Sequence, residues 1–163
     1  FRYDLNMKWA DAFPSEVTSV HMYAFDKDGR LAWFNSESGK VLQTDGYAME
    51  LDLPAGDYYL LAWCGLDNPE SAARQFTVPE VTVGITTLEE LTCRMEREYD
   101  TNGACSDRRL LPLFHGVKDI SIPNADNGET FSYLVPLTKN TNHVRIILQH
   151  LNGNAVDVDS FIS

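Results

Sequence analysis

The chain has 163 residues, of which 44% are hydrophobic and 11% aromatic, and it carries a formal net charge of -11. This composition supports a hydrophobic core rather than disorder, and the length suits one β-rich domain or one domain with the start of another. The negative charge argues against nucleic-acid binding and against adhesion to anionic lipid, and no apolar run reaches membrane-spanning length.

The first elements predicted along the chain are strands. Phe1–Trp9 alternates apolar and polar residues, as expected for a strand with one polar face. Asp11–Ser15 ends this stretch, and Val17–Phe25 follows as a second, more fully buried strand. Asp26–Gly29 has hairpin-turn chemistry and leads into a strand at Leu31–Asn35.

The clearest pattern is Tyr47–Cys64, which follows a polar connection at Ser36–Asp45 and is predicted to form a β-hairpin. Its first arm, Tyr47–Leu53, alternates with period two, and Pro54–Asp57 supplies turn residues. Its second arm, Tyr58–Cys64, is apolar almost throughout, so we expect a strand that is covered on both faces.

The second half of the chain shows weaker patterns. Phe76–Val83 suits a strand, although Pro79 restricts it to an edge or broken strand. Thr87 and Glu90 form a capping box, and one helical turn followed by a strand is favoured over a longer helix. The other predicted elements are a loop at Tyr99–Arg109, a short apolar run at Leu110–Gly116, strands at Val117–Ile122 and Thr130–Pro136, a polar link at Leu137–Asn142 and a hairpin of His143–Leu151 with Ala155–Ile162. About ten short strands with so little helix predict an all-β sandwich.

Residues with potential chemistry show no catalytic or metal-binding arrangement. The histidines have no metal-ligand spacing, and the paired carboxylates are explained best as solvated surface groups. The histidines are His21, His115, His143 and His150, and the acidic pairs are Asp26/Asp28, Glu89/Glu90 and Asp157/Asp159. No nucleophile motif or glycine-rich phosphate loop is present. The sequence therefore predicts no catalytic residue, no cofactor, no metal and no enzymatic activity.

Cysteines and tryptophans leave two alternatives open. Cys64 is expected to be a buried small hydrophobe, whereas Cys93 and Cys105 are either free or bridged if the protein is exported. Three tryptophans are either core residues or a sugar-stacking platform. Core packing is favoured for Trp9 and Trp63, which lie in strong strand patterns, and Trp33 is the least constrained.

Several short motifs together resemble a known family. They are Phe25-Asp26-x-x-Gly29, Leu53-Pro54-Ala55-Gly56-x-Tyr58, Ala62-Trp63, Leu113-Phe114-His115-Gly116 and Lys139-Asn140-x-Asn142-x-Val144. With the order of the predicted strands, from Phe1 to Phe161, they resemble the fimbrillin-associated anchor proteins of Bacteroidales, the FimB-like lipoproteins at the base of fimbriae.

The resemblance implies a transthyretin-like β-sandwich with Greek-key-type connections. It implies a domain at residues 1–142, with residues 143–163 as a terminal hairpin or the start of a second similar domain. It also implies export and attachment to the outer membrane through a lipidated cysteine upstream of the domain. No such cysteine is present here, so we expect this chain to be a soluble fragment.

The function implied by the resemblance is non-enzymatic. The protein would anchor fimbriae at the outer membrane and limit their length, with fimbrillin-type pilus subunits as partners and strand edges as the contact surface. Our specific hypothesis is that Phe1–Trp9 is a retained, paired strand. The alternatives are a fimbrial shaft or tip subunit, or an exported module that binds carbohydrate or protein.

Overall fold

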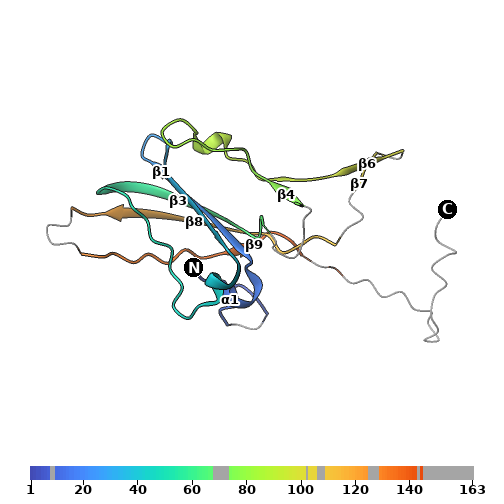
Figure 1. Ribbon diagram of the computed structural model, residues 1–163, viewed down its shortest axis with the longest axis horizontal. Coiled ribbons are helices and arrows are strands. Elements are labelled where there is room, and N and C mark those ends of the chain that lie inside the picture. The colour runs from blue at the N-terminus through green and yellow to red at the C-terminus, as the bar shows by residue number, and fades with distance from the viewer. Residues whose placement is uncertain are drawn as a thin grey trace.

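The computed structural model describes residues 1–7, 10–67, 74–101, 103–105, 109–124, 129–142 and 144. Its centre is a five-stranded antiparallel sheet with the strand order β2-β1-β3-β8-β9 (Figure 1). The strands are β1 (Ser19–Asp26), β2 (Leu31–Ser38), β3 (Gly56–Cys64), β8 (Phe114–Ile122) and β9 (Thr138–Lys139). Strands that follow each other in sequence are therefore not always neighbours in the sheet. The strands β2 and β3 are separated by β1, and β3 lies between β1 and β8.

Strand β3 occupies the middle of the sheet because both of its faces are apolar. It pairs along most of its length with β1 and along all of it with β8. Leu60 and Ala62 are buried on one face, and Leu61 is buried on the other. The prediction that Tyr58–Cys64 is covered on both faces is confirmed.

The face of the sheet that carries Met22, Leu60 and Ile120, called face one here, holds the largest core cluster. It is covered by the N-terminal residues, by α1 (Phe13–Glu16), by the 3-10 helix η1 (Gly39–Gln43) and by extended chain. Three aromatic rings, those of Phe1, Phe13 and Tyr47, stack here with centroids 5.5–6.1 Å apart.

The opposite face, face two, carries Tyr23, Phe25 and Leu61 and is covered by residues 76–95. This cover runs above the sheet in Figure 1 and has little regular structure. It contains β4 (Phe76–Thr77), the 3-10 helix η2 (Leu88–Glu90) and β5 (Arg94–Met95), and β4 pairs with β5. The predicted capping box at Thr87 and Glu90 is present and begins η2. The prediction of one helical turn followed by a strand is confirmed.

The predicted hairpin at Tyr47–Cys64 is wrong in its first arm. Residues 47–55 belong to no strand, and β3 pairs with β1 and β8 instead. Met49 is nonetheless buried on face one, and Tyr47, Leu51 and Leu53 pack beside it. The alternation of apolar and polar residues therefore indicates an extended segment with one buried side. It does not indicate whether the backbone of that segment is paired with a strand.

The predicted strand at Phe1–Trp9 is also wrong. Only Arg2 is paired, in a parallel bridge with Pro136, while Leu5 and Met7 are 69% and 97% exposed. Lys8 and Trp9 lie outside the described residues. The chain turns back because side chains offer it local hydrogen bonds: the Asp11 carboxylate accepts from the Tyr3 amide, and the Ala12 amide donates to the Tyr3 carbonyl. Such local bonding competes with strand pairing.

Several other boundaries differ from the sequence prediction. The strand predicted at Leu31–Asn35 continues to Ser38, and η1 occupies the middle of the expected polar connection. The expected loop at Tyr99–Arg109 contains a small hairpin of β6 (Glu98–Asp100) and β7 (Gly103–Cys105). Strand β8 begins at Phe114, inside the short apolar run, and β9 lies in the expected polar link. In Thr130–Pro136, only Pro136 is paired.

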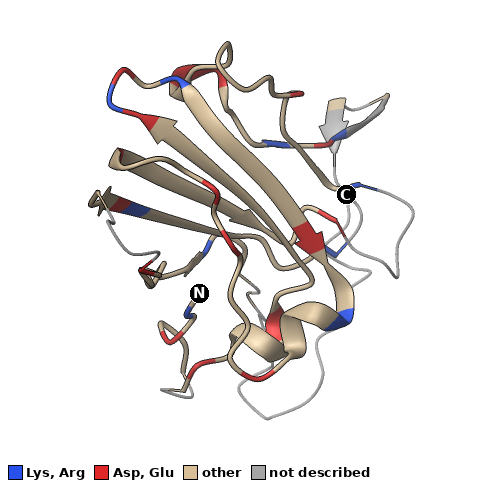
Figure 2. Ribbon diagram, turned by 60° about the vertical axis from the view of Figure 1, so that its left-hand side comes forward, with Lys and Arg blue, Asp and Glu red and all other residues tan. Residues whose placement is uncertain are grey.

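The architecture is thus all-β and antiparallel in its regular sheets, as predicted, with little helix. A transthyretin-like sandwich with Greek-key connections remains a prediction. The hairpin expected within residues 143–163 lies outside the described part, apart from Val144. Acidic residues are spread over connections and strand ends rather than gathered into one patch (Figure 2). In the part of the chain that is described, no helix is long and apolar enough to cross a membrane.

Candidate partner-binding groove

Asp26 and Glu90, from two of the predicted acidic pairs, have structural roles. The Asp26 carboxylate accepts from the Asp28 and Arg30 amides, which shapes the predicted β1–β2 turn. Glu90 accepts from the Thr87 amide in the capping box, and this lowers the pKa of Glu90. The side chains of Asp157 and Asp159 lie outside the described residues.

The histidines lie apart from one another. His21 Nε2 is 2.7 Å from an Asp67 carboxylate oxygen, and His115 Nδ1 is 3.0 Å from the side-chain oxygen of Asn140. His143 and His150 lie outside the described residues. Across the described positions, no three histidine, cysteine or acidic side chains are close enough to hold a metal ion.

The cysteines and tryptophans favour core packing. Cys64 is buried, and burial raises the pKa of its thiol to about 12. Cys93 is half-buried and is a free thiol, so no bridge from Cys93 to Cys105 is formed. Trp33 packs against the face-one core and Trp63 against the face-two core, so these two do not form one platform.

A cavity of about 890 Å³ lies over face one, and we call it the sheet-face groove. Its floor is apolar and includes Met22, Leu60 and Ile120 from three neighbouring strands. One wall is the extended segment 47–55, and the other is the segment 129–135. The groove therefore has an apolar floor, and it lies between two segments of chain that also contribute polar residues such as Glu50 and Glu129.

The two walls of the groove belong to no strand, although the Val135 carbonyl accepts from the Arg2 amide. Within residues 47–55, the one backbone hydrogen bond to another part of the backbone is from the Tyr47 amide to the Thr44 carbonyl. In the other wall, the Tyr133 hydroxyl donates to the Ser121 carbonyl of β8. The walls thus present backbone donors and acceptors that an added extended chain can bind.

The outer edge of β2 is a second surface with free backbone groups. At its start, the Leu31 amide donates to the Thr86 carbonyl and the Leu31 carbonyl accepts from Gly84. Further along, the Ser36 amide donates to the Asn35 side chain at 2.9 Å, so this edge is partly blocked by its own residues. In the described part of the sheet, no strand pairs with the remainder of this edge.

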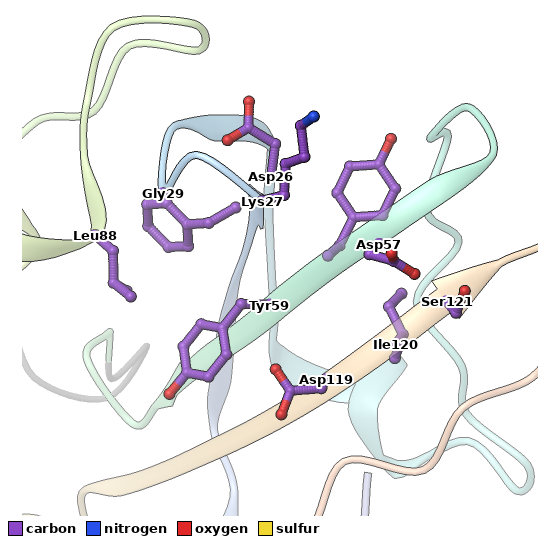
Figure 3. Close-up of a pocket in the computed structure, with 11 residues that line it drawn as sticks. Asp26, Lys27, Gly29, Asp57, Tyr59, Leu88, Asp119, Ile120 and Ser121 are labelled. Atoms are coloured by element: carbon purple, nitrogen blue, oxygen red, sulfur yellow. The ribbon is translucent and has the colours of Figure 1, made fainter.

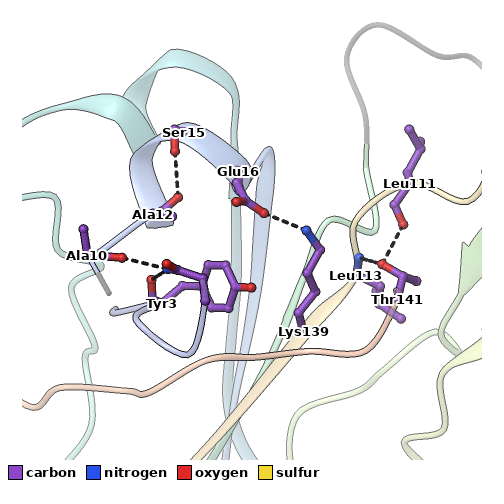
Figure 4. Close-up of polar contacts among 10 residues, drawn as sticks. Tyr3, Ala10, Ala12, Ser15, Glu16, Leu111, Leu113, Lys139 and Thr141 are labelled. Atoms are coloured by element: carbon purple, nitrogen blue, oxygen red, sulfur yellow. Dashed lines mark hydrogen bonds and ion pairs between the residues drawn. The ribbon is translucent and has the colours of Figure 1, made fainter. Parts of the chain in front are cut away.

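The motifs Leu113–Gly116 and Lys139–Asn142 lock together at one end of the sheet (Figure 4). The Asn140 amide donates to the Leu113 carbonyl, and the Leu113 amide donates to the Thr141 hydroxyl. The Lys139 ammonium lies 2.7 Å from the Glu16 carboxylate and over the Phe114 ring. These motifs hold the fold together and do not form a reactive site.

A smaller hollow of about 600 Å³ lies between η2 and the far ends of β3 and β8 (Figure 3). Tyr59 and Asp119 lie opposite each other on adjacent strands, next to the pair of Asp57 and Ser121. The sequence did not indicate this hollow, because its residues come from four separate elements.

Comparisons with known proteins place these features in context. The chain matches, over residues 1–163, the family model described as fimbrillin-A associated anchor proteins Mfa1 and Mfa2. No curated protein matches it in sequence.

Solved structures give consistent similarities. A candidate polysaccharide-binding protein of Bacteroides thetaiotaomicron is 30% identical over 85% of this chain and 45% of its own, with a TM-score of 0.69. A candidate adhesin of Bacteroides ovatus is 28% identical over 97% of this chain and 50% of its own, with a TM-score of 0.76. The fimbrial anchor protein Mfa2 of Porphyromonas gingivalis is similar in fold, at 21% identity over 85% of this chain and 48% of its own, with a TM-score of 0.59. This chain spans about half the length of each of them.

Proposed function

Because the chain belongs to the family of fimbrillin-A associated anchor proteins, as its motifs predicted, we propose that it is part of a protein that anchors fimbriae at the outer membrane and limits their length. Its partners are fimbrillin-type pilus subunits, and a lipidated cysteine upstream of this chain attaches the protein to the membrane. The family consists of fimbrial anchors rather than enzymes, in agreement with the predicted lack of enzymatic activity.

The observation that carries this proposal is the sheet-face groove. Its apolar floor and its walls, which belong to no strand, suit an extended segment of a pilus subunit, whose backbone would bond to the walls while alternate side chains enter the groove. The hypothesis that Phe1–Trp9 itself is a retained strand is not kept, because among its described residues, 1–7, Arg2 alone is paired in a bridge. The groove takes the place of that strand as the proposed contact surface.

We propose that the same groove also accounts for limiting the length of a fimbria. A subunit bound in the groove would hold this protein at the base of the fibre. We therefore expect one anchor for many shaft subunits. A shaft subunit, which is the nearest alternative, would occur in numbers comparable to its neighbours.

The experiment uses the full-length, lipidated parent protein as bait in a pull-down from outer membranes. The proposal predicts recovery of fimbrillin-type subunits in large excess over the bait. A Leu51→Asp variant places a charge in the groove wall and should abolish this recovery, whereas Val83→Asp adds the same charge at a site that is 56% exposed and does not line the groove. Recovery with Leu51→Asp equal to that of the parent would refute the role of the groove.

Saccharide binding is a second candidate function, favoured by the hollow around Tyr59. An aromatic ring beside exposed carboxylates can stack against a sugar and accept hydrogen bonds from its hydroxyl groups. Calorimetric titration with neutral oligosaccharides tests this function. Binding that is lost in Tyr59→Ala would support a carbohydrate-binding module in place of an anchor.

A further inference from the structure

Two segments far apart in sequence run side by side and in the same direction, and we call them the entry and exit segments. The entry segment is Phe1–Tyr3, and the exit segment is 135–141. The Arg2 amide donates to the Val135 carbonyl at 3.0 Å, and the Leu137 amide donates to the Arg2 carbonyl at 2.8 Å. The bridge between Arg2 and Pro136 is parallel. All six strand pairings of the described sheets, in contrast, are antiparallel along their ladders.

These backbone bonds are partly shielded from water, because Arg2, which makes both of them, is exposed but lies among buried residues. Tyr3, Val135 and Leu137 are 4%, 3% and 1% exposed, and the Tyr3 ring meets the Phe114 ring edge-on at 4.9 Å. Shielding matters because water that reaches a strained hydrogen bond can replace the lost partner and lower the barrier to rupture.

A second contact joins the two ends of the described fold (Figure 4). Lys139, in the exit segment, forms a 2.7 Å ion pair with Glu16 in α1, and both side chains are less than one-third exposed. The helix is in turn tied to the entry segment, because the Asp11 carboxylate accepts from both the Tyr3 and Phe13 amides.

The exit segment is also fastened to the central sheet beyond its two ladder residues. The Asn140 amide donates to the Leu113 carbonyl at 2.7 Å, and the Thr141 hydroxyl both accepts from the Leu113 amide and donates to the Leu111 carbonyl. Thr141 is 8% exposed. The end of the exit segment is therefore bonded to the rest of the fold at several points rather than by one bond.

We infer that the paired entry and exit segments form a shear clamp that keeps this domain folded under tension along the chain. In a parallel pair, the start of one segment and the end of the other lie at opposite ends of the pair. Tension between them makes the segments slide past each other, so every bond between them is loaded at the same time. In a peeling geometry the bonds break one after another, which requires less force.

The biological meaning of the clamp rests on the proposed function, because a protein that holds a fibre at a surface carries the load on that fibre. The mechanical resistance of the clamp does not depend on the proposed function. It belongs to the isolated chain and is measured without a pilus subunit, so the clamp and the anchor role can fail independently of each other.

Single-molecule force spectroscopy of the full chain, placed between marker domains in a polyprotein, tests the clamp by pulling in two directions. One direction runs from residue 1 to residue 163. The other runs from residue 1 to an Asn124→Cys attachment, with Cys93 and Cys105 replaced by serine, which applies tension at one end of the pair and peels it. The clamp predicts a rupture force several-fold higher in the first direction. Equal rupture forces would overturn it.

Matched variants test the same inference in the end-to-end direction. Glu16→Gln removes the ion pair that joins the ends and should lower the rupture force. Asp4→Asn removes the exposed 2.9 Å ion pair between Asp4 and Arg2. Both partners of this pair lie at the N-terminal end of the chain, so the pair does not join the two segments, and the rupture force should stay unchanged. Thermal unfolding of both variants shows whether each is folded. A rupture force that falls equally in both variants, or in neither, would contradict the clamp.

Discussion

Gly116 is the residue whose replacement tests the packing of the exit segment most sharply. A Cβ atom at this position would lie 2.6 Å from the Pro136 carbonyl oxygen, 2.7 Å from Leu137 Cδ2 and 2.9 Å from Val135 Cγ1. Gly116 has no positive φ, so the cost of Gly116→Ala comes from this contact rather than from its backbone conformation.

The magnitude follows from the movement that alanine requires. Ordinary contact begins at 3.4 Å, so the Pro136 carbonyl must move away from β8 by roughly 0.8 Å, the difference between 3.4 and 2.6 Å. That movement strains the two hydrogen bonds to Arg2 on either side. Overpacking and weakened bonds together should reduce the free energy of unfolding by about 2–4 kcal/mol.

Urea denaturation of Gly116→Ala measures this loss, with an unchanged m-value as the sign that the compactness of the end states is unchanged. Amide exchange at Leu137 should speed up as well. The control is Gly84→Ala, where φ is +80° and nothing lies within 4 Å of the new Cβ. Its cost should be about 1 kcal/mol, with no change at Leu137. The packing account is refuted if Gly116→Ala costs no more than Gly84→Ala.

Three further changes have defined outcomes. Phe114→Ala empties a fully buried ring site and should cost about 3–5 kcal/mol in urea denaturation. Thr87→Ala removes half of the capping box and should cost about 1 kcal/mol, with faster exchange at the Glu90 amide. Burial raises the pKa of Cys64 from 9.0 to about 12, so the folded state keeps this proton while the unfolded state loses it. Stability should fall as pH rises through that window, by about 1.4 kcal/mol per pH unit, and Cys64→Ala should show a smaller slope.

The central sheet could be predicted from sequence because burial and pairing coincide there. In β3, both faces are apolar, and the neighbouring strand β1 is nearly as apolar. The turn at Asp26–Gly29 and the capping box at Thr87 are set by short-range side-chain bonds, which a local pattern contains in full.

The two wrong strands failed because alternation reports burial and not pairing. Tyr47–Leu53 alternates since one of its sides lies on face one, yet its backbone has no ladder partner. In Phe1–Trp9, the alternation matches burial as far as Tyr3, whose side chain is buried. The Tyr3 amide then donates to the Asp11 carboxylate, and the chain turns back instead of continuing as a strand. No local signal distinguishes an extended covering segment from a strand.

The sheet-face groove could not be predicted because its floor and walls come from five separate stretches of chain. The family motifs could be recognised but their role could not. Gly116, in the motif Leu113–Gly116, has no side chain, so the exit segment can pack closely against it. Lys139 forms its ion pair with Glu16, which lies 123 residues earlier in the sequence. Only the fold shows that these residues meet.

Amide hydrogen exchange across residues 47–53, with and without a purified fimbrillin-type subunit, tests the central claim most directly. The account predicts fast exchange in the free protein, because these amides have no ladder partner, and strong protection in the complex, when an added segment pairs with the groove wall. A complex that forms while residues 47–53 still exchange at their free rate would contradict the account.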